Sequence, residues 1–201
     1  MASILIEERL NDEKHLRTVS DFCCGTNEGL DNFLKSEAFE YNREGQGNTY
    51  LIWMPKKSDV VGYFTLKADS IEAYNEEEKR VVALPAVEIA RFAIQEKYQR
   101  NGFGTAIFGY HIVPKINAVK EIIGVNTIMV FVEDQDCKEY YQTPEEKKIK
   151  NFYSKLGFKL AEEEVQRFIR DDYNEGCRLM YMSTDKLDQI QSELYKSKKI
   201  P

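Results

Sequence analysis

The segment from Val87 to Val113 constrains the fold most strongly, because it predicts a strand, a glycine-bearing loop and a helix in direct succession. Its first apolar run ends at Ile94 and predicts the strand. Gly102 and Gly104 follow, and glycine lets the backbone approach a ligand closely because it lacks a Cβ atom. The first N–H groups of a helix that starts here have no intrahelical partner and lie at the positive end of the helix dipole. The segment therefore predicts an anion site that suits a pyrophosphate.

This loop contains neither the Gly-x-Gly-x-x-Gly dinucleotide fingerprint nor a Gly-Lys-Ser/Thr P-loop. Its pattern is Gln99-x-x-Gly102-x-Gly104, a few residues after a strand that ends Phe92-Ala93-Ile94. This pattern resembles the acetyl-CoA-binding motif of the GNAT superfamily of N-acyltransferases. The resemblance implies that acetyl-CoA is a co-substrate of the chain.

A second motif, Asn151-Phe-Tyr153-Ser-Lys-Leu-Gly157-Phe158, resembles the helix-to-strand junction of the same family. The two motifs occur in the family's order, and the resemblance covers about residues 50 to 183. It implies an α+β fold with a mixed central β-sheet, in which helices flank the sheet and a splayed strand pair admits acetyl-CoA. A single domain is expected over residues 1–201, with its core at about 50–183 and a C-terminal helix at about 185–197.

Hydrophobic alternation and turn residues predict the other elements. The expected strands are residues 3–10, 50–54, 60–67, 124–132, 158–169 and 176–183. A helix is expected from a cap at Thr26 or Asn27 to a stop at residues 45–47. Pro114 is expected to interrupt and bend the helix that follows the glycine-bearing loop.

Two long connections are expected between these elements. Residues 70–84 are rich in glutamate, and their charge either attracts a cationic amine to a nearby site or only solvates a connector. Residues 133–143 form the other connection. A helix is then expected to begin at Thr143, with Pro144 at its first position and Glu146 three residues after the threonine, and to end at Gly157.

The resemblance implies that the cofactor is held mainly by backbone atoms. Phe92, Ala93 and Ile94 are expected to bond the pantetheine arm and the acetyl carbonyl. The pyrophosphate is expected in the loop that follows. The loop residues implied in cofactor binding are Gln99, Arg100, Asn101, Gly102, Phe103, Gly104 and Thr105.

Tyr153 matches the family's tyrosine near the thioester sulfur, which implies a general acid that protonates the departing thiolate. Ile149, Phe152, Tyr153 and Leu156 also fall at i, i+3, i+4 and i+7, so a helical core stripe is the alternative interpretation. Many relatives place a cofactor-contacting asparagine seven residues before the tyrosine. That position is Glu146 here, so the contact is either missing or supplied from the connection at residues 133–143, which is longer than the family usually has.

Glu88 lies six residues before Ile94, where the histone-acetylating branch of the family keeps its general base. A carboxylate in this place accepts the proton that an ammonium substrate must lose. The alternative interpretation is a surface or ion-paired strand glutamate.

Composition argues against several classes of site and partner. The formal net charge is −6, from 28 Lys and Arg against 34 Asp and Glu, whereas proteins that hold nucleic acid usually carry a basic surface. Four cysteines without Cys-x-x-Cys spacing and two distant histidines, His15 and His111, predict no metal site. No apolar run approaches a membrane span and no signal peptide is evident, so a cytoplasmic location is expected.

The resemblance implies direct transfer of an acetyl group to a primary amine of a small molecule, peptide or protein. The N-terminal run Asp21-Phe-Cys-Cys-Gly25, followed by Leu30-Asp-Asn-Phe33-Leu34, is similar to a GNAT branch that includes toxins acetylating charged tRNA. A toxin acting on aminoacyl-tRNA is therefore one alternative; nucleic acid is otherwise not expected as a partner, and tRNA is the one exception left open. A cofactor-binding interaction module with degenerate catalysis is the other alternative. A homodimer through the C-terminal helix is left open.

Overall fold

The computed structural model describes residues 5–25, 27–55, 59–75, 77–133, 139–143, 146–149, 151–161 and 176–197. The chain forms two compact units. Unit 1 comprises Met1–Lys67, Ile89–Ala118 and Asp188–Pro201, and unit 2 comprises Ala68–Glu88 and Val119–Leu187. Each unit is considered by itself, and the single domain expected over residues 1–201 stays a prediction.

Unit 1 is built on strands joined by hydrogen bonds in the order of the chain. The strands are β1 (Ile6–Arg9), β2 (Asn48–Trp53), the first part of β3 (Val60–Asn75) and the second part of β4 (Arg80–Ile94). β1 and β2 are antiparallel with Ile6 opposite Trp53, and β2 and β3 are antiparallel with Asn48 opposite Leu66. The strands expected at residues 3–10, 50–54 and 60–67 are thereby confirmed.

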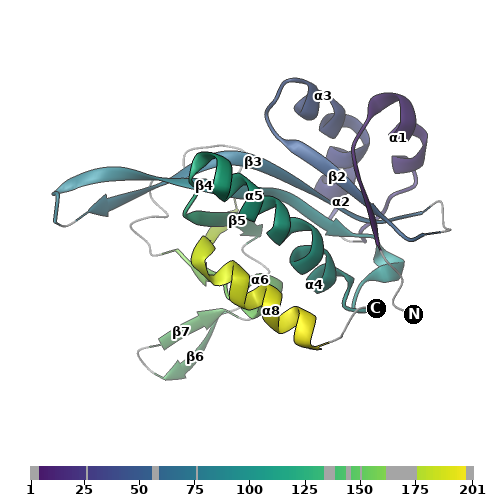
Figure 1. Ribbon diagram of the computed structural model, residues 1–201. Helices are drawn as coiled ribbons and strands as arrows, with labels where there is room; N and C mark the ends of the chain where they lie inside the picture. The colour runs from purple at the N-terminus through teal and green to yellow at the C-terminus, as the bar shows by residue number, and fades with distance from the viewer. Residues whose placement is uncertain are drawn as a thin grey trace. The chain divides into compact units, whose positions relative to one another are not determined.

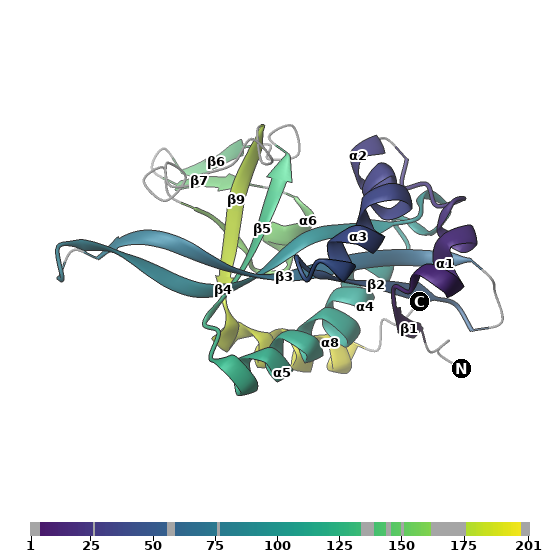
Figure 2. The ribbon, with the colours of Figure 1, turned by 90° about the horizontal axis from the view of Figure 1, so that it is seen from above.

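Helices cover both faces of this sheet (Figure 2). One face carries α1 (Asp12–Val19), α2 (Glu28–Asn32), the π-helix η1 (Phe33–Glu37) and α3 (Ala38–Arg43). The other carries α4 (Phe103–Ile107), the π-helix η3 (Phe108–Ile112) and the start of α5 (Val113–Ile123). The sequence patterns predicted no helix at α1. Among the described residues, no helix is long and apolar enough to cross a membrane.

The core of unit 1 on the α1–α3 side is aromatic. Tyr63 of β3 is fully buried, its ring lies 5.4 Å from that of Phe22, and its hydroxyl donates a hydrogen bond to the carbonyl oxygen of Leu30 at 2.7 Å. Asn27 caps α2, because its Oδ1 accepts the N–H of Leu30 at 3.1 Å. The capped helix expected from Thr26 or Asn27 is therefore confirmed, with Asn27 as the cap.

The helix after the glycine-bearing loop changes pitch instead of ending. The π turn η3 lies between α4 and α5, and the N–H of Val113 bonds to the carbonyl of Phe108, five residues earlier. Pro114 follows directly and has no N–H to donate. The predicted interruption at Pro114 therefore takes the form of a π turn before the proline. α8 (Leu187–Ser197) runs beside α5, and Asn117 Nδ2 lies 3.3 Å from Asp188 Oδ1 (Figures 1 and 2).

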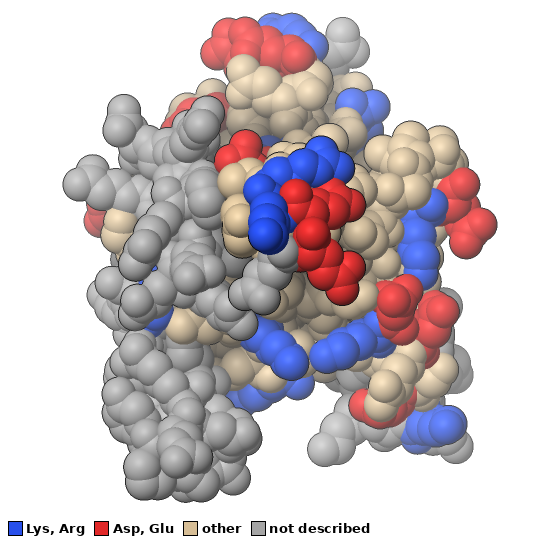
Figure 3. Space-filling view, turned by 90° about the vertical axis from the view of Figure 1, so that its left-hand side faces the viewer, with Lys and Arg blue, Asp and Glu red and all other residues tan. Residues whose placement is uncertain are grey.

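In unit 2, β3 and β4 continue as a long hairpin (Figure 1). The expectation of a connector at residues 70–84 was wrong, because β3 extends to Asn75 and β4 begins at Arg80. The glutamates concentrate at the turn, where Asn75 Oδ1 accepts the N–H groups of Glu77 and Glu78 at 3.0 and 3.1 Å. Acidic and basic side chains are mixed here, with Arg80 Nε 2.6 Å from Glu78 Oε2 (Figure 3).

The rest of the unit 2 sheet is mixed, as expected. β5 (Thr127–Glu133) is parallel to β4. The paired stretch begins with Ala86 opposite Thr127 and ends with Glu88 opposite Met129, as expected of a strand pair that splays apart. β9 (Cys177–Ser183) is antiparallel to β5 along its whole length, and β8 (Lys159–Leu160) pairs with β9. The expected strand at 158–169 is thus present at its start, and its part beyond residue 161 lies outside the described residues.

The helix expected to begin at Thr143 was wrong. β6 (Glu139–Thr143) and β7 (Glu146–Ile149) form an antiparallel hairpin, and α6 covers only Phe152–Lys155. Asn151 is the cap: its Oδ1 accepts the N–H of Ser154 at 2.8 Å, and its own N–H donates to Ser154 Oγ at 2.9 Å. The two reciprocal hydrogen bonds stabilise a helix that starts after Asn151. Thr143 follows tyrosines, which favour a strand, so no helix starts there.

Strand β1 is held by charged side chains on both of its faces. Glu7 Oε1 lies 2.6 Å from Lys115 Nζ, and Glu7 Oε2 lies 3.2 Å from His111 Nδ1. The neighbouring Glu8 lies 2.7 Å from Lys14 Nζ and 3.0 Å from His15 Nε2. Both histidines of the chain therefore contact β1.

Glu7→Gln is expected to make the protein less stable at pH 7 and less sensitive to acid. Burial raises the pKa of Glu7, but the hydrogen bonds with His111 and Lys115 outweigh it and hold the pKa below its ordinary value. The stability that the carboxylate contributes is therefore complete above its ordinary pKa and is lost as pH falls through the lowered one. We expect a loss of about 1 kcal/mol in the free energy of unfolding at pH 7 that shrinks below about pH 4.

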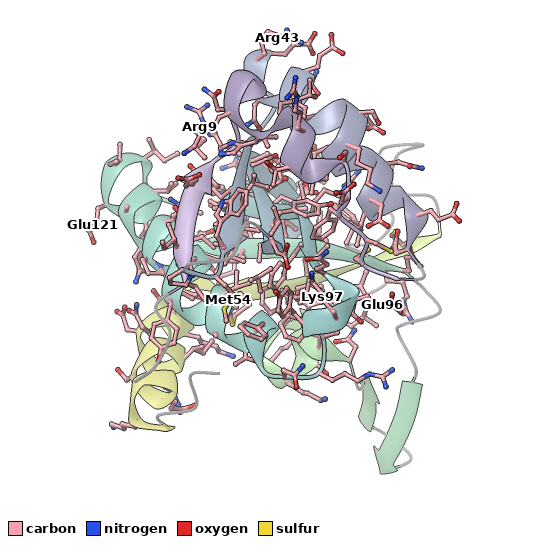
Figure 4. The ribbon with its side chains drawn as sticks, turned by 90° about the vertical axis from the view of Figure 1, so that its right-hand side faces the viewer. Arg9, Arg43, Met54, Glu96, Lys97 and Glu121 are labelled. Carbon is pink, nitrogen blue, oxygen red and sulfur yellow. The ribbon has the colours of Figure 1, made fainter. Side chains whose placement is uncertain are left out.

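Urea unfolding at a series of pH values measures this difference. Glu121→Gln is the matched control, because Glu121 is exposed and points away from α5 (Figure 4). An equal loss for Glu7→Gln at pH 7 and pH 3 would contradict the assignment of charge to Glu7.

Candidate functional site

The end of β4 lies unusually close to β3 and α4. A Cβ atom added at Gly62 of β3 would lie 2.7 Å from the carbonyl oxygen of Ala93 and 2.9 Å from Cδ1 of Ile94. It would also lie 3.3 Å from Cδ1 of Ile107 in α4. Only glycine fits at such distances, so Gly62 allows the backbone of β3 to lie close to β4 at Ala93 and Ile94.

Side chains of β4 alternate between the two faces of the sheet, as the sequence predicted. Arg91 faces the α1–α3 side, where its guanidinium carbon lies 4.9 Å from the centre of the Phe33 ring. Ala93 lies on the same side and is buried in the aromatic core. Ile94 faces Ile107 of α4, and period-two alternation places Phe92 on that side too.

The glycine loop, residues 95–105, turns the chain from β4 into α4 and includes the first three residues of that helix. It contains the short 3₁₀-helix η2 (Glu96–Tyr98) and two residues with positive φ, Arg100 at 61° and Gly102 at 83°. The first bond of the helix joins the N–H of Ala106 to the carbonyl of Gly102 at 3.0 Å. The N–H groups of Phe103, Gly104 and Thr105 consequently have no partner within the helix. Such a succession of outward N–H groups after left-handed residues forms an anion site.

Hydrogen bonds hold the loop, and the ring of Tyr98 also packs against that of Phe103, with 5.6 Å between the ring centres. Gln99 Nε2 donates to the carbonyl oxygens of Cys24 at 2.7 Å and Ile94 at 3.0 Å. The N–H of Glu96 donates to the carbonyl of Cys23 at 2.8 Å. Gln99 was expected to bind cofactor; its side-chain amide donates both of its hydrogens to the protein backbone, and the cofactor contact stays a prediction. Sequence reasoning missed Cys23 and Cys24, although the Asp21–Gly25 motif contains both.

Charged side chains surround the loop. Lys97 Nζ lies 2.6 Å from Asp59 Oδ2, and Glu96 precedes it in the chain (Figure 4). Arg100 is exposed and has no ion-pair partner among the residues that the structure describes. Its guanidinium is therefore available to an anion at the glycine loop.

In unit 2, Tyr153 lies in the short helix α6. Its carbonyl oxygen accepts the N–H groups of Leu156 at 3.0 Å and Phe158 at 3.1 Å, so the chain turns sharply after it at Gly157, where φ is 96°. Its ring lies between those of Phe152 at 5.2 Å and Phe158 at 5.6 Å. The core-stripe interpretation required one helix over residues 149–156, and it is wrong because Ile149 lies in β7.

The hydroxyl of Tyr153 is a proton donor at neutral pH. Burial raises the pKa of Tyr153 above its ordinary value of about 10, so the phenol stays protonated. Within the described ranges, no hydrogen bond engages this hydroxyl. The group is therefore available to donate to a ligand.

Glu88 lies at the last pair of the β4–β5 ladder, opposite Met129. Its exposed fraction is 1%, so it is not a surface glutamate. Glu146 falls in β7, and its side chain lies outside the part that the structure describes. The expected cofactor residues thus come together in unit 1, and the two expected catalytic residues belong to unit 2.

Neither a metal centre nor a thiol nucleophile is apparent at these positions. Over the described ranges, no group of three or more His, Cys, Asp or Glu side chains is placed to hold a metal ion. Burial, followed by a hydrogen bond with Asp31, raises the pKa of Cys24 to about 12. A thiol with that pKa is a poor nucleophile at neutral pH, because it is protonated.

No family model matches the sequence, and no curated protein matches it. Solved structures do match. A mutant of the toxin AtaT, with a tyrosine replaced by phenylalanine, is 20% identical with a TM-score of 0.68 over 92% of this chain and 93% of that one. A tyrosine-to-phenylalanine mutant of KacT is 20% identical with a TM-score of 0.66 over 92% and 98%.

A further structure, titled as a bacterial toxin, is 15% identical with a TM-score of 0.71 over 96% of both chains. AtaT has also been solved with acetyl-methionyl-tRNAfMet, with acetyl-CoA and the C-terminus of the antitoxin AtaR, and as an AtaT–AtaR complex bound to DNA. The chain has the fold of these toxins. The mixed-sheet α+β fold of the GNAT type that the sequence predicted is therefore confirmed.

Proposed function

We propose that the chain is a toxin-type N-acetyltransferase of the GNAT superfamily, which transfers the acetyl group of acetyl-CoA to the amino group of an aminoacyl-tRNA. The observation that carries this proposal is the likeness to AtaT and KacT over more than nine tenths of both chains. One AtaT structure contains acetyl-methionyl-tRNAfMet. The sequence alone ranked a small-molecule, peptide or protein amine first, and the likeness favours its alternative.

The residues of the glycine loop fit the diphosphate of acetyl-CoA. The N–H groups of Phe103, Gly104 and Thr105 are unpaired within the helix and lie at its positive end. The exposed guanidinium of Arg100, which has no ion-pair partner among the described residues, adds a positive charge. We assign to the backbone of Phe92, Ala93 and Ile94 the role that the resemblance implies, which is to bind the pantetheine arm. Asn101 Nδ2 donates to the carbonyl of Gln99 at 3.0 Å and so supports the loop.

Tyr153 is proposed as the general acid. As the amine nitrogen bonds to the acetyl carbon, the carbon–sulfur bond breaks and the thiolate needs a proton. The Tyr153 hydroxyl holds that proton at neutral pH, as a phenol with the ordinary pKa of about 10 does, and burial raises its pKa further. The raised pKa of Tyr153 increases the difference between its pKa and that of a thiol, which is about 8.5. Desolvation also raises the pKa of the thiol, so proton transfer from Tyr153 to the thiolate remains feasible.

Glu88 is proposed as the base that accepts the proton lost by the amine. The demand on this base depends on the acceptor. An α-amino group has a pKa of about 8 and is partly neutral in the cell, whereas a lysine amine at about 10.4 is almost wholly protonated. An aminoacyl-tRNA therefore needs less help from Glu88 than a lysine does. By analogy with the AtaT–AtaR complexes, an antitoxin protein is the proposed regulatory partner.

The first experiment is transfer of labelled acetyl groups from acetyl-CoA to two separate pools, aminoacyl-tRNA in one and small amines with peptides in the other. We expect label on the aminoacyl-tRNA and none on deacylated tRNA, which is the control. Label only on amines and peptides would overturn the toxin assignment and leave an acetyltransferase of those acceptors. Binding of acetyl-CoA without transfer to either pool would point to the interaction module.

Gly104→Glu is expected to abolish acetyl-CoA binding. The new carboxylate would lie among the N–H groups that face the diphosphate, where it repels the phosphates and fills the space that glycine leaves. Titration calorimetry measures the loss. Gln46→Glu, which adds the same charge at an exposed turn of unit 1, is the control and should bind normally. Retained affinity in Gly104→Glu would rule out the loop assignment.

Tyr153→Phe is expected to lower kcat by about 10² to 10⁴, the usual worth of a general acid, with little change in acetyl-CoA affinity. Tyr181→Phe removes a hydroxyl from a partly buried tyrosine of the same unit and is the control. Steady-state kinetics with the acceptor identified in the labelling experiment gives kcat and the KM for acetyl-CoA. Turnover at the parental rate in Tyr153→Phe would show that its ring only packs against its neighbours.

A further inference from the structure

The peptide bond between Cys23 and Cys24 connects α2 to the glycine loop. On one side, the N–H of Cys24 donates to Asp31 Oδ1 of α2 at 2.8 Å. On the other, the carbonyl oxygen of Cys23 accepts the N–H of Glu96 at 2.8 Å. A trans peptide is planar, and its N–H and C=O point in opposite directions. One rigid group therefore spans the distance between a helix carboxylate and the loop.

The next carbonyl along the chain makes a second connection. The oxygen of Cys24 accepts one hydrogen of Gln99 Nε2 at 2.7 Å, and the other hydrogen goes to Ile94 at 3.0 Å. Residues 23 and 24 thus bond both ends of the turn that leads from β4 to Arg100. The positive φ of Gly25, 94°, turns the chain away directly afterwards, where an L side chain would be strained.

Asp31 is well suited to fix this connection. Its exposed fraction is 7%, and it projects from a helix that Asn27 caps. Cys24 Sγ also donates to the carbonyl of Asn27 at 3.3 Å, which closes the segment onto the helix start. An ionised acceptor makes a stronger hydrogen bond and polarises the peptide, so the bond from Glu96 to the opposite oxygen is strengthened as well.

We propose that Asp31 is a positioning residue for the glycine loop, acting through the Cys23–Cys24 peptide without touching the ligand. It orients that peptide so that the carbonyls of Cys23 and Cys24 hold Glu96 and Gln99, and the loop then presents its N–H groups to the diphosphate. The inference rests on the proposed function for the identity of the ligand. The hydrogen-bonded connection itself does not.

The test compares three variants by two measurements. Asp31→Ala removes the acceptor, and Asp31→Asn keeps an oxygen at the same place. Thr65→Val is the control, because it breaks the buried hydroxyl pair of Thr49 and Thr65, 2.9 Å apart, elsewhere in unit 1. The measurements are hydrogen exchange of the Glu96 amide and the dissociation constant of acetyl-CoA. Should Asp31→Ala fail to fold, Asp31→Ser replaces it, since its hydroxyl is one bond too short to reach Cys24.

Asp31→Ala is expected to speed exchange at Glu96 and to weaken acetyl-CoA binding, each by about fivefold or more relative to Thr65→Val, because a buried donor loses its acceptor. For Asp31→Asn, the exchange rate at Glu96 and the dissociation constant of acetyl-CoA should both stay within about threefold of the parental values. Equal exchange and equal affinity in Asp31→Ala and Thr65→Val would overturn the proposal and leave Asp31 a stabilising residue only. If the parent binds no acetyl-CoA, the proposed function fails, and exchange at Glu96 still decides the role of Asp31.

Discussion

The conformation of the backbone after Ile94 is the constraint on which the site in unit 1 depends. Two residues with positive φ, Arg100 and Gly102, set the direction in which α4 starts. The side-chain amide of Gln99 stabilises the turn before them by a hydrogen bond to the carbonyl of Ile94. Gly62 allows β3 to approach the carbonyl of Ala93, so the strand end and the helix start lie against the same sheet. The groups that we propose to face an anion are mostly main-chain N–H groups, so this contact places little demand on the side chains between them.

The sequence predicted those parts of the structure that depend on local conformation. The glycine loop follows from Gly102, which adopts a positive φ, and from the apolar run that precedes it. The turn after Tyr153 follows in the same way from Gly157. Thr143 shows the limit of this reasoning: it has the residues of a good helix start, yet Asn151 and Ser154 form the pair that begins the helix. Local patterns identify candidates for a cap but do not rank them.

Features that depend on distant contacts were out of reach. Cys24 and Gln99 are separated by 75 residues, and no spacing in the sequence connects them. The burial of Glu88 depends on how β4 pairs with β5, which an isolated strand pattern does not specify. The positions of the charges were out of reach as well. A formal net charge of −6 counts residues without their arrangement, whereas the structure pairs many of them, as at the hairpin turn, where Arg80 neutralises Glu78.

Strand β1 lies at an edge of its sheet: one row of its backbone groups bonds to β2, and the other has no strand neighbour within the part of the chain that the structure describes. Its consecutive glutamates, Glu7 and Glu8, each contact a lysine and a histidine on opposite faces. If β1 shifted by one residue, every side chain would change faces. One such shift would place Arg9 against a lysine, and the opposite one would place Ile6 among charged groups. The arrangement of charge therefore specifies the register of this strand, which its four residues of backbone pairing alone would leave free to slip.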